Sequence, residues 1–123
     1  MSAQLTAGLP DDDFLSDGLL TKRVLRASAL AALAPVGNEL LWDLGAGTGS
    51  IGIEWCRLHP ANRAVAVERD SERSARISVN AATLGVAPRT ALAASGCGCG
   101  IEGGPSRAKA WWTGESRRTG RGT

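Results

Sequence analysis

Long hydrophobic runs are missing from this sequence, which has no stretch of about 18 apolar residues and so predicts no membrane-spanning helix. The segment from Met1 to Asp13 has neither the basic start nor the apolar stretch of a secretory signal peptide, and it ends in three acids. We therefore expect a cytoplasmic protein with no membrane partner.

Ligands for a metal ion are also scarce. The chain has one histidine and three cysteines, and one residue separates Cys97 from Cys99, whereas zinc and redox motifs place two residues there. Cys56 lies in an apolar helical pattern, which favours a buried thiol. His59 precedes a proline and is expected to end a helix. The sequence therefore predicts no metal site.

Large aliphatic residues are few in the last third of the chain. Residues 88–123 contain only Leu92 and Ile101 of this kind, together with eight of the 16 glycines. They carry six basic and two acidic residues, net +4, whereas residues 1–87 carry eight and ten, net −2, which together give +2. Such a segment has little from which to build a core. We predict the N-terminal half of a domain in residues 1–87 and an irregular, low-complexity tail without strands in residues 88–123.

Hydrophobic periodicity in the first part predicts alternating helices and strands after an irregular lead-in, residues 1–18. Thr21 and Ser71 are the expected N-caps of two helices. The expected elements are a helix at 21–33, a strand at 39–44, a helix at 50–58, a strand at 63–68 and a helix at 71–84. This order predicts a βαβα unit of a doubly wound α/β fold with one additional leading helix.

A glycine-rich loop, Gly45-Ala46-Gly47-Thr48-Gly49, lies between the first expected strand and the helix that follows it. Glycines at this position let the backbone turn sharply and let a ligand approach main-chain atoms closely. A dinucleotide-binding loop would place its third glycine at position 50, which is Ser50. The spacing therefore argues against a nicotinamide or flavin dinucleotide.

Two acids flank this loop and favour a different ligand. Asp43, two residues before the first glycine, would repel a pyrophosphate but tolerate the positive charge of S-adenosylmethionine. Glu68 ends the second strand, where a carboxylate can accept both hydroxyls of a ribose. The sequence thus predicts an S-adenosylmethionine site. The alternative is that the glycines only form a tight turn and that Glu68 is a solvated strand end.

Three further groups of residues leave alternatives open. The basic group Lys22, Arg23 and Arg26 either binds a carboxylate-rich substrate or forms the wet face of a helix. The acids near the N-terminus are either a functional cluster or a solvated lead-in. Adjacent tryptophans at 111 and 112, near several arginines, are better explained by an irregular tail than by nucleic-acid stacking, so we expect no nucleic-acid partner.

Four segments of the sequence resemble the decarboxylating precorrin methyltransferases of cobalamin biosynthesis, either the small stand-alone enzyme or the C-terminal domain of the two-domain C5,C15-methyltransferase. The segments are GLPDDDFLSDGLLTKRVLRA at 8–27, LLWDLGAGTGSIGIEW at 40–55, AVAVERD at 64–70 and NAATLGV at 80–86. The glycine motif alone is common to many methyltransferases. The lead-in, with Pro10-Asp11 and then Thr21-Lys22, is much more specific to this family.

The resemblance implies a class I S-adenosylmethionine-dependent methyltransferase with a Rossmann-like fold. It implies methylation of a corrinoid at C15 with loss of carbon dioxide from the C12 acetate, and a possible homo-oligomer. The family's cofactor contacts fall on Thr21, the loop Gly45–Gly49 and Glu68. Methyl transfer depends mostly on positioning, so no acid–base pair is required.

The tail departs from the family, which continues through further strands and helices. We hypothesise that a reading-frame break near residues 86–95 replaced the second half of the domain. The alternative functions are an inactive half-domain remnant and another small-molecule methyltransferase.

Overall fold

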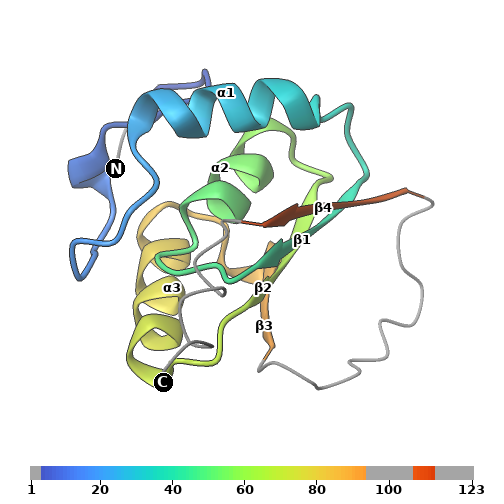
Figure 1. The fold of residues 1–123 in the computed structure, drawn as a ribbon. Coiled ribbons are helices and arrows are strands. Elements are labelled where there is room, and N and C mark those ends of the chain that lie inside the picture. The colour runs from blue at the N-terminus through green and yellow to red at the C-terminus, as the bar shows by residue number, and fades with distance from the viewer. Residues whose placement is uncertain (1–3, 94–106, 113–123) are drawn as a thin grey trace, which may run out of the picture.

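The computed structural model describes residues 4–93 and 107–112. Its strands form one parallel sheet in the order β3-β2-β1-β4 (Figure 1). In chain order the elements are η1 (Asp11–Asp13), α1 (Arg23–Leu33), β1 (Leu40–Leu44), α2 (Ser50–Leu58), β2 (Arg63–Val67), α3 (Ser71–Thr83), η2 (Ala87–Arg89), β3 (Thr90–Ala93) and β4 (Ala108–Trp112). The predicted order of helices and strands up to residue 84 is confirmed, and the bounds of α2 match the prediction.

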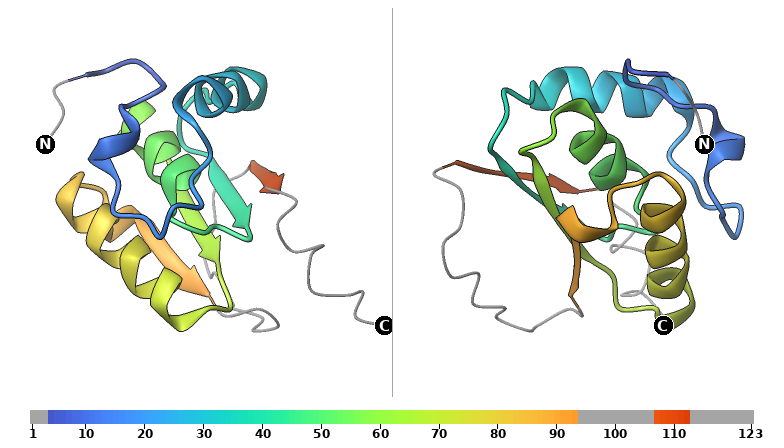
Figure 2. Two further views of the ribbon diagram at one scale, coloured as in Figure 1. Left: turned by 60° about the vertical axis from the view of Figure 1, so that its left-hand side comes forward. Right: turned by 180° about the vertical axis from the view of Figure 1, so that it is seen from behind.

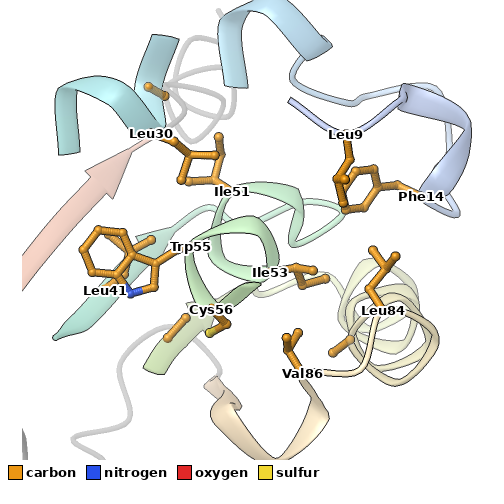
Figure 3. Packing of buried hydrophobic residues seen from close by; sticks show 13 residues of the cluster. Leu9, Phe14, Leu30, Leu41, Ile51, Ile53, Trp55, Cys56, Leu84 and Val86 are labelled. Carbon is orange, nitrogen blue, oxygen red and sulfur yellow. The ribbon is translucent and has the colours of Figure 1, made fainter. Parts of the chain in front are cut away.

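The hydrophobic core lies between the sheet and its helices. Leu41 on β1 and Ala64 on β2 contact α2, whose Ile53 and Trp55 are fully buried. Figure 3 shows that Leu9 and Phe14 from the lead-in, and Leu84 and Val86 after α3, join the same cluster. The α1, α2 and α3 helices lie together on one side of the sheet (Figure 2). The main cluster therefore lies between the sheet and these helices, and a smaller cluster of Leu40, Val65 and Ala93 lies on the other side of the sheet.

Both predicted N-caps are wrong. Helix α1 begins at Arg23 with Lys22 at the N-cap, and the carbonyl oxygen of Thr21 instead accepts a hydrogen bond from Arg26. Helix α3 is capped by Asp70, whose Oδ1 accepts the N–H groups of Glu72 and Arg73, each at 3.0 Å. Asp70 takes this position because it is the last extended residue before the helix (φ −77°, ψ 122°).

The prediction that no strand follows Val86 is wrong for two segments. Strand β3 pairs with β2, and β4 pairs with β1 on its other side, from Leu40–Ala108 to Leu44–Trp112. Side-chain alternation gives little indication of either strand, because β3 has the sequence TALA and β4 has AKAWW. Pairing with an existing sheet makes these residues strands. The division at residue 87 stays a prediction, and Cys97 and Cys99 lie outside the described residues.

Lys109 ties β4 to the rest of the fold. Its Nζ donates to the carbonyl oxygens of Leu33 at 2.6 Å and Ala34 at 3.1 Å, where α1 ends. It also forms an ion pair with the buried Glu39 at 3.1 Å. The Val36 N–H and Lys109 together hold the pKa of Glu39 below its usual value despite burial. Strand β4 therefore supplies the cation that pairs with Glu39, a buried carboxylate in the first half of the chain.

Two smaller expectations at the helices, for Cys56 and His59, are confirmed. Cys56 is a buried thiol, as predicted, and burial raises its pKa to about 11. His59 ends α2, also as predicted, and its Nδ1 accepts the N–H of Ala61. No helix within the described ranges is long and apolar enough to cross a membrane. Within the same ranges, no group of three potential metal ligands occurs.

Candidate functional site

The glycine loop joins the end of β1 to the start of α2 and folds over the end of β2. Gly45, Gly47 and Gly49 have φ values of +68°, +61° and +78°, which residues with a Cβ rarely adopt. The N–H groups of Gly45 and Ala46 donate to the carbonyl oxygen of Val67 at 2.9 and 3.1 Å. These bonds fix the loop against the strand that carries the second predicted acid.

Gly49 is required for space as well as for conformation. A Cβ at this residue would lie 2.8 Å from Cγ2 of Ile77 on α3. Because Ile77 is fully buried, it has no room to move away. The third glycine of the motif therefore lets the loop approach α3 closely.

Glu68 lies beside the loop, where it is 9% exposed. Its Oε2 accepts the N–H of Gly47 at 2.9 Å, and its Oε1 accepts the N–H of Asp70 at 3.0 Å. The structure thus brings together two features that are 21 residues apart in the sequence. Each carboxylate oxygen keeps a lone pair that can accept a further hydrogen bond.

Asp43 is fully buried beneath the start of α2. Its Oδ2 accepts the N–H of Gly52 at 3.2 Å, and its Oδ1 has no hydrogen-bond partner within the described ranges. Burial raises the pKa of Asp43 to about 7, with a smaller contribution from the charge of Glu68 and an opposing one from the Gly52 bond. Asp43 therefore lies behind the loop as a buried carboxyl group whose charged form is disfavoured below about pH 7.

Asn80 connects the loop to the lead-in, a role that sequence analysis missed. Its Oδ1 accepts the N–H of Leu15 at 2.7 Å, and its Nδ2 donates to the carbonyl oxygens of Leu15 at 2.9 Å and Thr48 at 3.0 Å. The available indication was a polar residue on the same helix face as Ile77 and Ala81, both buried. The lead-in therefore crosses α3 next to the loop.

Arg26 anchors the other end of the lead-in and is neither a wet-face residue nor free to bind a substrate. Its side chain is fully buried, and its Nε forms an ion pair with Glu54 at 2.8 Å. Its other nitrogens donate to Asp11 at 2.8 Å and to the carbonyl oxygens of Leu9 and Thr21. The charged lead-in, with Asp11, is thus held by a buried cation rather than fully solvated.

Thr21 lies where this anchored segment meets α1. It is half-buried and lines an open groove with Leu25 of α1 and Trp111 of β4. Lys22, next to it, is exposed. The proposed contact of Thr21 with a ligand stays a prediction.

The residues at this site fit a cationic nucleoside better than a dinucleotide. Three glycines leave main-chain atoms approachable, and the acceptors of Glu68 suit sugar hydroxyls. The unpartnered, buried carboxylate oxygen of Asp43 favours positive charge nearby. The same two carboxylates would repel a pyrophosphate.

Comparisons with known proteins show which family the chain is similar to. The model of the precorrin methyltransferase domain family matches residues 12–99, beyond the boundary expected at residue 87. Precorrin-6Y C(5,15)-methyltransferase [decarboxylating] of Sinorhizobium sp is 52% identical over 82 residues, which are 67% of this chain and 20% of that protein. The chain thus spans about a fifth of the length of this curated relative.

Two solved structures are similar to the fold. The C-terminal domain of precorrin-6Y C5,15-methyltransferase from Rhodobacter capsulatus has a TM-score of 0.70 and 41% identity, covering 74% of this chain and 48% of that domain. An RNA methyltransferase from Salinibacter ruber, in complex with S-adenosyl-L-homocysteine, has a TM-score of 0.55 and 32% identity, covering 62% and 49%. On the match of the family model, this chain belongs to the precorrin methyltransferase domain family.

Proposed function

We propose that this chain binds S-adenosylmethionine at the loop Gly45–Gly49 and Glu68, and that it forms the cofactor-binding part of a decarboxylating corrinoid methyltransferase. The reaction is methylation of C15 with release of the C12 acetate carboxyl group as carbon dioxide. The contact between Glu68 Oε2 and the Gly47 N–H, at 2.9 Å, carries the proposal because it joins the two halves of the site.

Each residue has a distinct task in this proposal. Glu68 accepts hydrogen bonds from the two ribose hydroxyls, and the glycine loop lets the methionine part approach the backbone. Asp43, from behind the loop, stabilises the positive charge of the sulfonium. Thr21 donates its hydroxyl hydrogen to the methionine carboxylate. When bound, S-adenosylmethionine supplies an electrophilic methyl group, and the chain's contribution is to hold it in line with the acceptor carbon.

Calorimetric titration of the folded chain with S-adenosylmethionine tests the cofactor site. We expect binding that Glu68→Gln weakens by about tenfold or more, because the neutral amide accepts at only one of its two atoms. The matched control is Glu72→Gln, which changes a glutamate whose side chain is 84% exposed on α3. This control is expected to leave the affinity unchanged.

Two outcomes would contradict the proposal. Equal binding by the Glu68→Gln and Glu72→Gln variants would remove Glu68 from the site. Absence of binding by a chain whose circular dichroism shows the expected helix content would favour the inactive half-domain, which the 48% coverage of the Rhodobacter domain makes the second candidate. A cytoplasmic location and a homo-oligomer stay predictions.

A further inference from the structure

The side chain of Asn80 on α3 is bonded to two segments that are far apart in the sequence. It is 2% exposed, and its Nδ2 donates to the carbonyl oxygen of Thr48 in the glycine loop at 3.0 Å. The same nitrogen donates to the carbonyl oxygen of Leu15 in the lead-in at 2.9 Å, and Oδ1 accepts the Leu15 N–H at 2.7 Å. Both hydrogens of the amide are therefore used by backbone partners.

The other contacts between this part of the lead-in and α3 are closer to the surface. Asp17 pairs with Arg73 at 3.1 Å and with Arg76 at 3.5 Å, and the three side chains are between 26% and 28% exposed. Ion pairs with this exposure contribute little. The side chain of Leu15 is 53% exposed, so its burial contributes little as well. Beyond Phe14, which packs in the core, the position of the lead-in therefore depends chiefly on the buried amide.

Thr48 lies between two loop glycines that make close contacts. Its neighbour Gly47 donates to Glu68 at 2.9 Å, and its other neighbour Gly49 packs closely against α3. Thr48 is 4% exposed, and its carbonyl oxygen is held by Asn80. Loss of this hydrogen bond would leave a buried carbonyl oxygen without its partner and would free the backbone between the two glycines. The loop conformation that Glu68 contacts therefore depends in part on Asn80.

We propose that Asn80 is a positioning residue for S-adenosylmethionine and acts through Thr48 and Leu15 rather than on the ligand itself. The lead-in runs from Leu15 to Thr21, the residue proposed for the methionine carboxylate. One amide group thus sets the spacing between the two segments that supply the ligand contacts, so a ligand bound at the loop alters the environment of Leu15. This inference rests on the proposed function, because it concerns the same ligand.

The first test uses the wild-type chain, as amide spectra of isotopically labelled protein during titration with S-adenosylmethionine. We expect the Leu15 backbone amide and the side-chain amide of Asn80 to shift with the same midpoint as the glycine loop. The backbone amide of Ala75, an exposed residue of the same helix, is the control and is expected to stay in place. Loop signals that shift while those of Leu15 and Asn80 do not would overturn the proposal.

The second test is calorimetric titration of Asn80→Ala, which removes the three hydrogen bonds. We expect its affinity for S-adenosylmethionine to fall by about tenfold or more. The control Val86→Ala truncates another buried side chain after α3 and lowers stability by leaving a cavity. Its affinity is expected to change by less than about twofold, because it contacts neither the loop nor residues 15–21. Circular dichroism of both variants confirms that they are folded.

The outcomes separate this role from the proposed function. A folded wild-type chain that binds no S-adenosylmethionine would overturn both. Binding by the wild-type chain, with equal affinities in Asn80→Ala and Val86→Ala, would overturn the role of Asn80 alone. If Asn80→Ala does not fold, the wild-type spectra decide.

Discussion

Asp43 and Glu68 lie at the carboxyl ends of neighbouring parallel strands, and their side chains lie on two different sides of the glycine loop. Glu68 reaches the loop directly through Gly47, whereas Asp43 is buried behind it. Sequence spacing predicted both positions, because the carboxyl ends of adjacent parallel strands meet at one edge of the sheet. It did not predict that one acid would be fully buried, since burial depends on how α2 closes over β1.

Replacing Asp43 with asparagine should remove part of the pH dependence of the unfolding free energy. Burial raises the folded-state pKa of Asp43 to about 7, above its ordinary value of 3.8, so the folded state binds an extra proton between these values. Its contribution to stability is therefore present at low pH and is lost as the pH rises towards 7. We expect the Asp43→Asn variant to gain about 2–4 kcal/mol relative to wild type between pH 4 and pH 8.

Urea unfolding at a series of pH values measures this difference. The asparagine side chain still accepts the N–H of Gly52, so the local hydrogen bond is preserved. A constant difference between the two proteins across this range would show that Asp43 is ionised in the folded state throughout.

Two glycines with positive φ allow the cost of backbone strain to be separated from the cost of steric overlap. Gly49→Ala should cost about 3 kcal/mol or more, because its Cβ would meet Ile77 at 2.8 Å in addition to the left-handed strain. Gly18→Ala carries strain alone, since nothing lies within 4 Å of its Cβ, and should cost about 1–2 kcal/mol. Chemical denaturation gives both values, and equal costs would contradict the close approach of the loop to α3.

At the scale of elements, periodicity predicts the interior of the fold better than its joints. The apolar pattern of α2 predicted its bounds, Ser50–Leu58. The caps at Lys22 and Asp70 were missed, because several residues near each helix start are able to cap it and the entering backbone decides between them. Strand β4 was missed because its neighbour β1 lies more than 60 residues earlier in the chain. Hydrophobic periodicity is read in windows of about 11–18 residues and says nothing about pairing over such a separation.

Arg26 joins the lead-in to helix α2, because it bonds to Asp11 and Leu9 of the lead-in and to Glu54 of α2. Its guanidinium lies 4.8 Å from the ring centre of Phe14 and pairs with the buried Glu54, which in turn accepts the N–H groups of Gly8 and Leu9. Arg26→Met should lower the unfolding free energy by about 3–5 kcal/mol, because it leaves Glu54 buried and unpaired.

Thermal unfolding of Arg26→Met and Arg76→Met compares this buried pair with a surface pair. Arg76 contacts Asp17 at 3.5 Å with both side chains partly exposed, so its replacement should cost less than about 1 kcal/mol. Similar losses in the two variants would mean that the Arg26 network contributes no more than a surface ion pair.

At the scale of the molecule, β4 is either an integral strand of the cooperative fold or part of a tail that adds nothing to its stability. Lys109 favours the first, because it neutralises Glu39, caps the carbonyl end of α1 and lies 5.6 Å from the ring centre of Trp55. The origin of residues 88–123 in a reading-frame break stays a hypothesis, and sequencing the locus tests it. Their contribution to the sheet is a separate matter that stability measurements address.

Lys109→Met should lower the unfolding free energy by about 2–3 kcal/mol at neutral pH, because Glu39 would keep its charge without its cation. Because the pKa of Glu39 is lowered in the folded state, its carboxylate stabilises the fold at pH values above the ordinary pKa of a glutamate. This stabilisation is lost as the pH falls through the lowered pKa. The deficit of the variant should therefore shrink in acid. Lys22→Met, at an exposed lysine, is the control, and an equally small effect of both would place β4 outside the cooperative fold.

The most direct test of the central claim is an amide chemical-shift map of the 12.7 kDa chain during titration with S-adenosylmethionine. We predict that the largest shifts fall on Gly45, Ala46, Gly47, Thr48 and Gly49, and on Glu68. Shifts confined to the groove between α1 and residues 4–8 of the lead-in, or shifts of the loop that persist unchanged in Glu68→Gln, would contradict a site built from the glycine loop and this carboxylate.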